Sequence, residues 1–175
     1  AMIHIVTGGS GSGKSAFAEE QIVKFSGDRR IYIATMYPFD EESRRRVERH
    51  RRMRAGKRFE TVECYTHLEN LEIPAGADVL LECMSNLTAN EMYREDGAGE
   101  QTCEAVCRGI NALAERAGNL VVVTNEVFSD GIVYDPETER YLEYLGRINQ
   151  YLARIADRVT EVVYGIPVCV KGMRR

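Results

Sequence analysis

A glycine-rich segment near the start of the chain has the residue types and the spacing of a phosphate-binding loop. The segment GGSGSGKS, residues 8–15, places Gly8, Gly13, Lys14 and Ser15 in the pattern G-x-x-x-x-G-K-[ST]. Its glycines allow the backbone to curl until successive N–H groups point at phosphate oxygens, and a helix that starts there adds partial positive charge. We expect Lys14 to reach the β- and γ-phosphates of a nucleoside triphosphate and the Ser15 hydroxyl to bind Mg²⁺.

A magnesium ion in such a loop also needs a carboxylate at the end of a neighbouring strand. Two glutamates qualify, because Glu82 ends the apolar run ADVLLE and Glu126 follows the run LVVVTN. A carboxylate at such a place is otherwise an ordinary strand-end residue. Glu82 is the favoured ligand because it directly abuts its apolar run, and Glu126 is the alternative.

A histidine lies in the middle of the most basic stretch of the chain. The segment RRRVERHRRMRAGKR, residues 44–58, holds eight arginines and one lysine around His50. Such a run is by default a solvated helix or a nucleic-acid contact. Two observations favour another interpretation: the chain has a net charge of −4, and Val47 and Met53 lie three residues either side of His50. On a helix these residues share one face, so we expect that face to contact the protein body and to direct His50 into the nucleotide site.

An imidazole in this position has a chemistry that a solvated helix does not need. A neutral ring nitrogen could attack a phosphorus atom and hold the group as a phosphoramidate, which divides one transfer into two steps. Neighbouring arginines such as Arg46 and Arg54 could stabilise the charge that spreads over the phosphate oxygens. The solvated helix remains the alternative interpretation. The other two histidines, His4 in the first apolar run and His67 in a turn-like segment, are expected to be structural.

The elements that position these residues follow from an alternation of short apolar runs with longer helical patterns, which is typical of βαβ units and a parallel sheet. The expected strands are residues 2–7, 30–35, 59–63, 77–82, 119–124 and 158–164, with 166–171 as an edge strand because it contains Pro167. The expected helices are residues 14–26, 39–55, 84–93, 101–117 and 136–156, and the most mobile loops are expected at 94–101 and 126–136. The sequence therefore predicts an α/β fold, a single three-layer P-loop domain (residues 2–175) with a mostly parallel sheet.

Composition and cysteine usage limit the classes of protein that fit. The 175 residues are 44% hydrophobic and 29% charged, as is usual for a soluble globular domain. No apolar run approaches the ~20 residues that span a bilayer, and no signal-peptide pattern opens the chain. Five scattered cysteines without a C-x-x-C pair predict reduced thiols and a cytoplasmic protein. The acidic net charge argues against a nucleic-acid partner.

The ordered set of motifs resembles the bifunctional adenosylcobinamide kinase / adenosylcobinamide-phosphate guanylyltransferase family of cobalamin biosynthesis. The segments that carry the resemblance extend over nearly the whole chain: IVTGGSGSGKS, IYIAT, RVERHRRMR, TVEC, LLEC, VTNEV, GIV, GRINQYLARIADRV and GIPVCVK. A P-loop followed by YIAT and then by a basic helix with one histidine is the most specific combination.

The resemblance implies a RecA-like fold, a homotrimer with sites near the subunit contacts, and two reactions. A nucleoside triphosphate, ATP or GTP, phosphorylates the hydroxyl of the aminopropanol arm of adenosylcobinamide. GTP then transfers GMP to that phosphate through a guanylylated histidine, which falls on His50, and pyrophosphate leaves. We expect His50 and Lys14 to be catalytic, and Ser15 and Glu82 to hold Mg²⁺. The family's nucleotide-binding positions fall on Gly8, Gly9, Ser10, Gly11, Ser12, Gly13, Lys14, Ser15, Ile33, Ala34, Thr35, Arg51, Arg52, Met53, Arg54, Glu63 and Glu82.

The chain departs from the family pattern at three places. Gly11 stands where many relatives carry arginine, Phe59 stands where tryptophan is frequent, and the segment 126–136 is longer than the usual loop. Two other functions stay open on the sequence alone. One is a single-function P-loop kinase of small molecules, and the other is an NTPase that binds nucleic acid through its basic helix.

Overall fold

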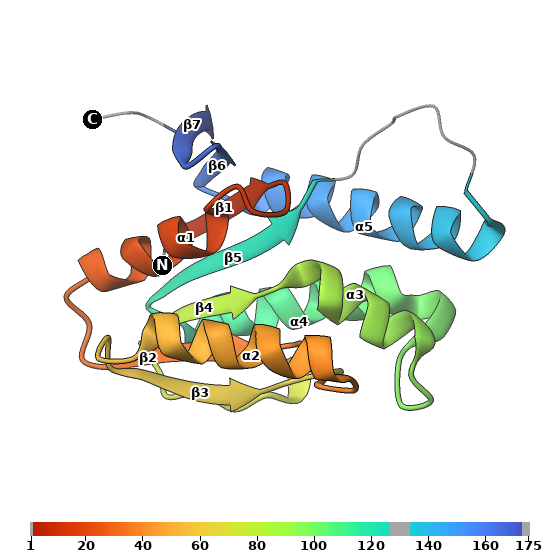
Figure 1. Ribbon diagram of the computed structural model, residues 1–175, viewed down its shortest axis with the longest axis horizontal. Coiled ribbons are helices and arrows are strands. Elements are labelled where there is room, and N and C mark those ends of the chain that lie inside the picture. The colour runs from red at the N-terminus through yellow and green to blue at the C-terminus, as the bar shows by residue number, and fades with distance from the viewer. Residues whose placement is uncertain (1, 127–133, 173–175) are drawn as a thin grey trace.

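The computed structural model describes residues 2–126 and 134–172. Their strands form a seven-stranded sheet in the order β3-β2-β4-β5-β1-β6-β7 (Figure 1). The strand bounds are β1 Met2–Gly8, β2 Arg30–Ala34, β3 Phe59–Glu63, β4 Asp78–Glu82, β5 Asn119–Asn125, β6 Arg158–Val163 and β7 Ile166–Lys171. Neighbouring strands in this part of the chain run parallel, apart from the antiparallel β6–β7 pair. Every predicted strand is confirmed, and β7 is the edge strand that Pro167 indicated.

The α-helices within the described residues are α1 Lys14–Lys24, α2 Glu41–Arg54, α3 Met84–Tyr93, α4 Thr102–Arg116 and α5 Pro136–Ile155. Each corresponds to a predicted helix, with ends that differ by no more than two residues. The starts of α2 and α5 are set by capping, because the Asp40 and Asp135 carboxylates accept hydrogen bonds from the N–H groups of Ser43 (2.7 Å) and Thr138 (2.9 Å). None of these helices is both long enough and apolar enough to cross a membrane.

Two single-turn 3₁₀ helices were not predicted. They are η1 Leu68–Asn70 and η2 Gly99–Gln101. Three residues are too few to show a helical period in the sequence, so no pattern of apolar residues marks them.

Helices cover both faces of the sheet, which gives the three layers that the sequence predicted. On one face, α3, α4 and α5 bury a cluster that includes Leu87, Ile110 and Ile148. On the opposite face, α1 buries Ala18 and Ile22 against the strands. This two-sided burial explains why the central strands read as continuous apolar runs, since a strand covered on both faces has no solvated side.

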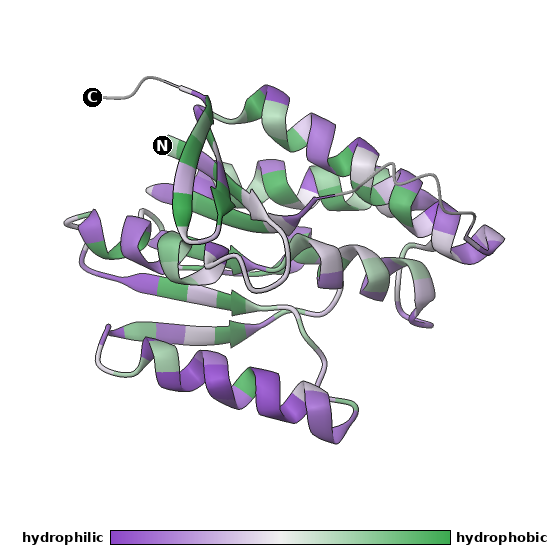
Figure 2. Cartoon of the chain, turned by 45° about the horizontal axis from the view of Figure 1, so that its top comes forward, coloured by the Kyte–Doolittle hydropathy of each residue, from purple (hydrophilic) through white to green (hydrophobic). Residues whose placement is uncertain are grey.

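Helix α2 differs from the other helices because it is hydrophilic over most of its surface (Figure 2). Its buried residues are Ser43 and Arg54. The Arg54 guanidinium lies 3.4 Å above the centroid of the Tyr32 ring in β2, which anchors the end of the helix to the sheet. A helix with so little apolar surface does not pack closely along a sheet, and a cavity remains between α2 and the strand ends.

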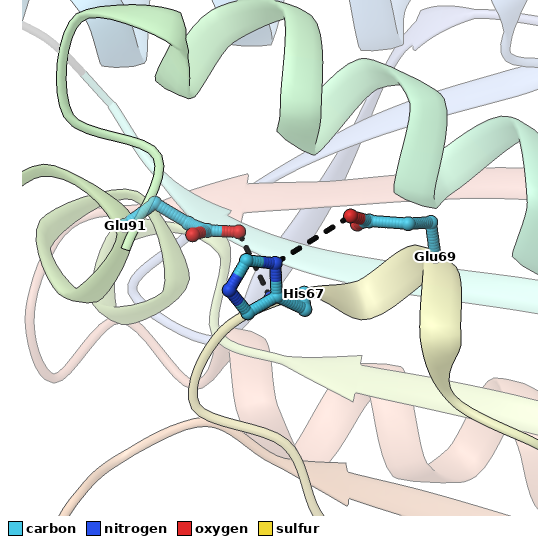
Figure 3. Close-up of side chains that lie close together, drawn as sticks. All are labelled: His67, Glu69 and Glu91. Atoms are coloured by element: carbon cyan, nitrogen blue, oxygen red, sulfur yellow. Dashed lines mark hydrogen bonds and ion pairs between the residues drawn. The ribbon is translucent and has the colours of Figure 1, made fainter. Parts of the chain in front are cut away.

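The segment 94–101, predicted as a mobile loop, is tied to the turn before η1 by His67. The His67 ring lies with Nε2 2.5 Å from the Asp96 carbonyl oxygen, and its backbone N–H donates to Glu91 at 3.0 Å. The carboxylates of Glu69 and Glu91 lie on either side of the imidazole, with Glu69 3.6 Å from Nδ1 (Figure 3). These contacts join two loops, which agrees with the structural role predicted for His67.

The remaining histidine outside the cavity, His4, is buried in β1 and is 2% exposed. Its Nε2 lies 2.8 Å from the Thr160 hydroxyl in β6. Burial, reinforced by the positive charge of Arg158, lowers the pKa of His4 from 6.5 to about 4. The folded chain therefore holds this imidazole neutral where an unfolded chain would protonate it.

This pKa shift predicts how stability depends on pH. Because the pKa of His4 is depressed on folding, its contribution is present above pH 6.5 and is lost as the pH falls toward 4. Between about pH 7 and about pH 4.5, we expect the free energy of unfolding of the wild type to fall by about 2 kcal/mol more than that of His4→Asn. Denaturant titrations at both pH values measure this difference. Thr160→Val, which keeps the imidazole buried, should retain the wild-type dependence, and equal falls for wild type and His4→Asn would contradict the assignment.

Candidate functional site

A cavity of about 520 Å³ lies at the carboxyl edge of the sheet, between the P-loop and α2. Parallel strands place their carboxyl ends at one edge, so residues far apart in the sequence meet there. The lining comes from the loop after β1, from β3, from the ends of β2, β4 and β5, and from one face of α2. The predicted phosphate loop and the predicted histidine therefore line the same cavity.

The segment between β1 and α1 has the backbone that a phosphate loop requires. Gly13 has a φ of +94° immediately before α1, in the left-handed region that favours glycine. Gly8 is needed for a different reason, since a Cβ there would lie 2.7 Å from the backbone carbonyl oxygen of Val162. The Lys14 ammonium donates a 3.1 Å hydrogen bond across the loop to the carbonyl oxygen of Gly9. The lysine is thus held over the loop, where the phosphates of a nucleotide would contact it.

Glu82, the favoured metal carboxylate, ends β4 with a side chain that is only 5% exposed. It accepts hydrogen bonds from the Ser15 hydroxyl and, at 3.3 Å, from the Tyr32 hydroxyl. The buried Thr35 hydroxyl holds the adjacent backbone, because it accepts a 2.7 Å hydrogen bond from the Cys83 N–H and lies 3.0 Å from the Glu82 carbonyl oxygen. A hydroxyl and a carboxylate side by side are ligands that Mg²⁺ prefers, so Ser15 and Glu82 fit the ion that a P-loop implies.

His50 lies on the face of α2 that borders this cavity. Its Nδ1 is 3.3 Å from the Tyr32 hydroxyl oxygen and 3.7 Å from Glu82 Oε1. Val47 and Met53 line the same cavity, so the stripe with helical spacing faces the protein body as predicted. The imidazole therefore contacts the same carboxylate as the P-loop serine.

Positive charge surrounds the cavity. Its cationic lining residues are Lys14, Arg46, Arg49, Arg51 and Arg54. Arg54 is buried, with one guanidinium nitrogen 3.3 Å from the Thr61 hydroxyl. Its other terminal nitrogen is buried without a hydrogen-bond partner among the described residues. A buried cationic donor beside a cavity is suited to bind an anionic oxygen such as that of a phosphate.

Most of the residues predicted to bind nucleotide line this cavity: Ser10, Gly11, Ser12, Gly13, Lys14, Ser15, Ala34, Thr35, Arg51, Met53, Arg54, Glu63 and Glu82. Gly8 and Gly9 shape the loop without lining the cavity. The side chain of Ile33 does not reach it, because β2 alternates and directs Ile33 into the core on the opposite face of the sheet. The side chain of Arg52 is also outside it, exposed elsewhere on α2.

Glu126, the alternative carboxylate, is not among the residues that line the main cavity. It follows β5 and borders a smaller cavity beside α5. A hydrogen bond with Glu161, together with burial and the negative charge of Glu161, raises the pKa of Glu126 to about 7. Glu82 lies beside the P-loop serine inside the main cavity, whereas Glu126 lies outside it, so the geometry favours Glu82.

Several polar residues that line the cavity were not predicted from the sequence, among them Tyr32, Tyr65, Asn86 and Asn125. A signal existed for two of them. Asn125 ends the apolar run LVVVTN, at the sheet edge where Glu82 was sought. Tyr32 is the one residue with a polar group in the run IYIA. Tyr65 and Asn86 carry no comparable signal, since nothing in their neighbourhood shows which way a loop or helix start will turn.

Two of the three departures from the family pattern lie in the described residues. Gly11 has a φ of +73° and borders the cavity, with no atom within 4 Å of the place that a Cβ would take. Phe59 packs edge-on against Tyr32, with ring centroids 6.3 Å apart. The third departure, the long segment 126–136, lies mostly outside the described residues, which stop at 126 and resume at 134.

The sheet has the arrangement of solved P-loop ATPases. The chain is similar to a solved ATPase domain with a TM-score of 0.51 and 11% identity, over 91% of this chain and 68% of that one. It is also similar to a prototypical ATPase from the type III secretion system of pathogenic bacteria, with a TM-score of 0.58 and 12% identity over 96% of this chain and 56% of that one. At such low identity the likeness shows the fold alone, which is RecA-like.

Sequence comparison is more specific. The bifunctional adenosylcobalamin biosynthesis protein CobU of Escherichia coli K12 is 37% identical over 97% of this chain and 100% of its own length. The corresponding CobU protein of Salmonella typhimurium LT2 is 34% identical with the same coverage, and CobP of Pseudomonas aeruginosa is 30% identical over 98% of each chain. The family model for cobinamide kinase / cobinamide phosphate guanyltransferase matches residues 4–170, and the chain belongs to this family.

Proposed function

We propose that this chain phosphorylates adenosylcobinamide with a nucleoside triphosphate and then transfers GMP from GTP to the adenosylcobinamide phosphate through a guanylylated His50. The observation that supports this most directly is the shared carboxylate of Glu82. It accepts a hydrogen bond from the P-loop residue Ser15, and it lies 3.7 Å from the ring nitrogen of His50. A nucleotide held by the P-loop would therefore have an imidazole beside its phosphates.

In the kinase step, residues 8–15 would bind the triphosphate of ATP or GTP through backbone N–H groups and the Lys14 ammonium. Ser15 and Glu82 would hold Mg²⁺, which draws charge from the phosphate oxygens when it is bound. The substrate hydroxyl oxygen bonds to the γ-phosphorus while the bond from that phosphorus to the β,γ-bridging oxygen breaks. The nucleoside diphosphate keeps the electron pair, and the hydroxyl proton passes to solvent.

In the guanylyl step, a nitrogen of His50 bonds to the α-phosphorus of GTP while the bond from that phosphorus to the α,β-bridging oxygen breaks. Pyrophosphate leaves with the electron pair, and the ring carries GMP as a phosphoramidate. A phosphate oxygen of adenosylcobinamide phosphate then attacks the same phosphorus, and the nitrogen regains its electron pair. Arg51 and Arg54, which line the cavity, would stabilise the negative charge on the phosphate oxygens.

The proposal extends to assembly and location. We take residues 2–175 as one nucleotide-binding domain that forms a homo-oligomer, a trimer by family resemblance, in the cytoplasm. Exposed apolar side chains at the β6–β7 edge support self-association, with Tyr164 94%, Ile166 63% and Val170 64% exposed. The five cysteines, all within the described residues, are free thiols, as a reducing compartment would maintain them.

No nucleic-acid partner and no membrane span are part of this proposal. His50 and four arginines of the basic helix α2 line the wall of the cavity, so the helix does not present all of its basic residues to solvent. A helix that tracks nucleic acid would instead present its cations along an open face.

Replacing the P-loop lysine tests nucleotide binding. Lys14→Ala should lower kcat/KM by at least about a hundredfold in both reactions, because the phosphates lose their positioning charge. Both activities would be measured with purified protein, with Lys24→Ala at the exposed end of α1 as the matched control. Near-normal kinase turnover in Lys14→Ala would show that the triphosphate binds elsewhere.

Replacing the histidine tests the division of roles. His50→Asn keeps a polar side chain but cannot carry GMP, so guanylyl transfer should fall by about three orders of magnitude or more. The kinase rate should fall by no more than about tenfold, or roughly 1.4 kcal/mol. Arg45→Ala, on the same helix but outside the cavity, is the control and should behave as wild type in both assays. Persistent GMP transfer, or joint loss of both activities in folded protein, would refute the proposed role of His50.

The bond in the covalent intermediate gives an independent test. Protein incubated with Mg²⁺ and α-labelled GTP should retain one GMP by intact mass, whereas γ-labelled GTP should leave no label. A phosphoramidate should lose its GMP in acid and keep it in alkali. A label that survives acid would point to a hydroxyl carrier.

A further inference from the structure

We infer that Tyr32 fixes the tautomer of His50, so that Nδ1 carries the hydrogen and Nε2 is the nitrogen that accepts GMP. This inference rests on the proposed function, because it concerns the atom used by the same histidine. Tyr32 was not among the residues predicted to act in the site. It is a positioning residue, since it acts on the nucleotide only through His50.

The donors and acceptors around the Tyr32 hydroxyl allow one consistent arrangement. The phenol has a single hydrogen, and its oxygen lies 3.3 Å from Glu82 Oε2 and 3.3 Å from His50 Nδ1. An ionised carboxylate can only accept, so the phenol hydrogen belongs to Glu82. The phenol oxygen can then only accept from the imidazole. His50 Nδ1 must therefore be the donor.

The opposite tautomer would leave repulsive contacts. If Nδ1 carried a lone pair, that lone pair would face Glu82 Oε1 at 3.7 Å without a hydrogen between them. The phenol would also have to turn its hydrogen toward Nδ1, which leaves its oxygen against the carboxylate. The tautomer of a histidine is commonly set by the hydrogen bond that one of its ring nitrogens makes. Here both neighbours of Nδ1, the Tyr32 hydroxyl and the Glu82 carboxylate, favour a hydrogen on that nitrogen.

The Tyr32 ring is held firmly enough to enforce this choice. It is 4% exposed, with the Arg54 guanidinium 3.4 Å above its centroid and Phe59 edge-on at 6.3 Å. Burial, with the nearby negative charge of Glu82, raises the pKa of Tyr32. The phenol therefore keeps its hydrogen at neutral pH and remains a donor to the carboxylate.

This arrangement leaves Nε2 as the nucleophile. Nε2 has no hydrogen-bond partner among the residues that the structure describes, and the ring borders the cavity. When Nε2 bonds to the α-phosphorus, the imidazole, which keeps its hydrogen on Nδ1, becomes positively charged and pyrophosphate leaves with the electron pair. The Glu82 carboxylate, 3.7 Å from Nδ1, balances that positive charge.

Nuclear magnetic resonance can identify the bonded nitrogen directly. The chain has three histidines, so protein labelled with ¹⁵N-histidine gives few imidazole signals, and His50→Asn assigns those of His50. Before GTP is added, we expect the hydrogen of His50 on Nδ1. After Mg·GTP is added, we expect the phosphorus–nitrogen coupling to be carried by Nε2.

Two variants test whether Tyr32 is responsible. Tyr32→Phe removes only the hydroxyl, and we expect adduct formation to slow by about tenfold to a hundredfold, with part of the His50 population shifted to a hydrogen on Nε2. Phe59→Leu is the matched control, since it alters the packing of the Tyr32 ring and leaves the hydroxyl in place. It should keep the wild-type tautomer and form the adduct within about threefold of the wild-type rate.

The outcomes separate this inference from the proposed function. Phosphorus on Nδ1, or an unchanged tautomer and adduct rate in Tyr32→Phe, overturns the role of Tyr32 while the guanylylated His50 stands. The absence of any adduct in wild-type protein overturns the proposed function itself. Equal effects of Tyr32→Phe and Phe59→Leu on the tautomer would show that ring packing, and not the hydroxyl, sets the imidazole.

Discussion

A buried carboxylate is the constraint on which the arrangement of this site depends. An ionised group with a 5% exposed side chain is costly unless hydrogen bonds and charges compensate it. Glu82 obtains that compensation from Ser15, from Tyr32 and from the nearby His50 ring. These residues belong to α1, β2 and α2, so three elements are brought together around one side chain. The carboxylate thereby brings the phosphate loop and the basic helix to opposite sides of one cavity, where both contact the same side chain.

The two sides of the cavity are built differently. Strand β4 is buried along its whole length, and the Thr35 hydroxyl holds the backbone at its end. The Glu82 carboxylate is therefore attached to a rigid part of the core. Helix α2 buries few side chains, and Arg54 stacked on Tyr32 anchors its last turn. The helix is kept close to the sheet by polar contacts, and the space that this leaves is the cavity.

Under the proposed function, the two reactions share one set of phosphate-binding groups. Both move a phosphorus centre between oxygen or nitrogen atoms, and both need cations around the phosphate oxygens. The cavity supplies Lys14 from the loop and arginines from the facing helix. A single cavity of about 520 Å³ with an imidazole over the loop is consistent with steps that follow one another on bound nucleotide.

The sequence by itself determined the order of strands and helices along the chain, the phosphate loop, and the face of the basic helix that carries His50. These follow from local rules, namely the period of apolar residues and the spacing of glycines. It did not determine which side chains meet across the sheet. Ile33 points into the core and Tyr32 points toward His50 because β2 alternates between the two packed faces, and Glu126 borders the smaller cavity beside α5 instead of the main one. Only the tertiary structure decides such contacts, because strand order and layer packing bring together residues whose distance along the chain carries no information about their distance in space.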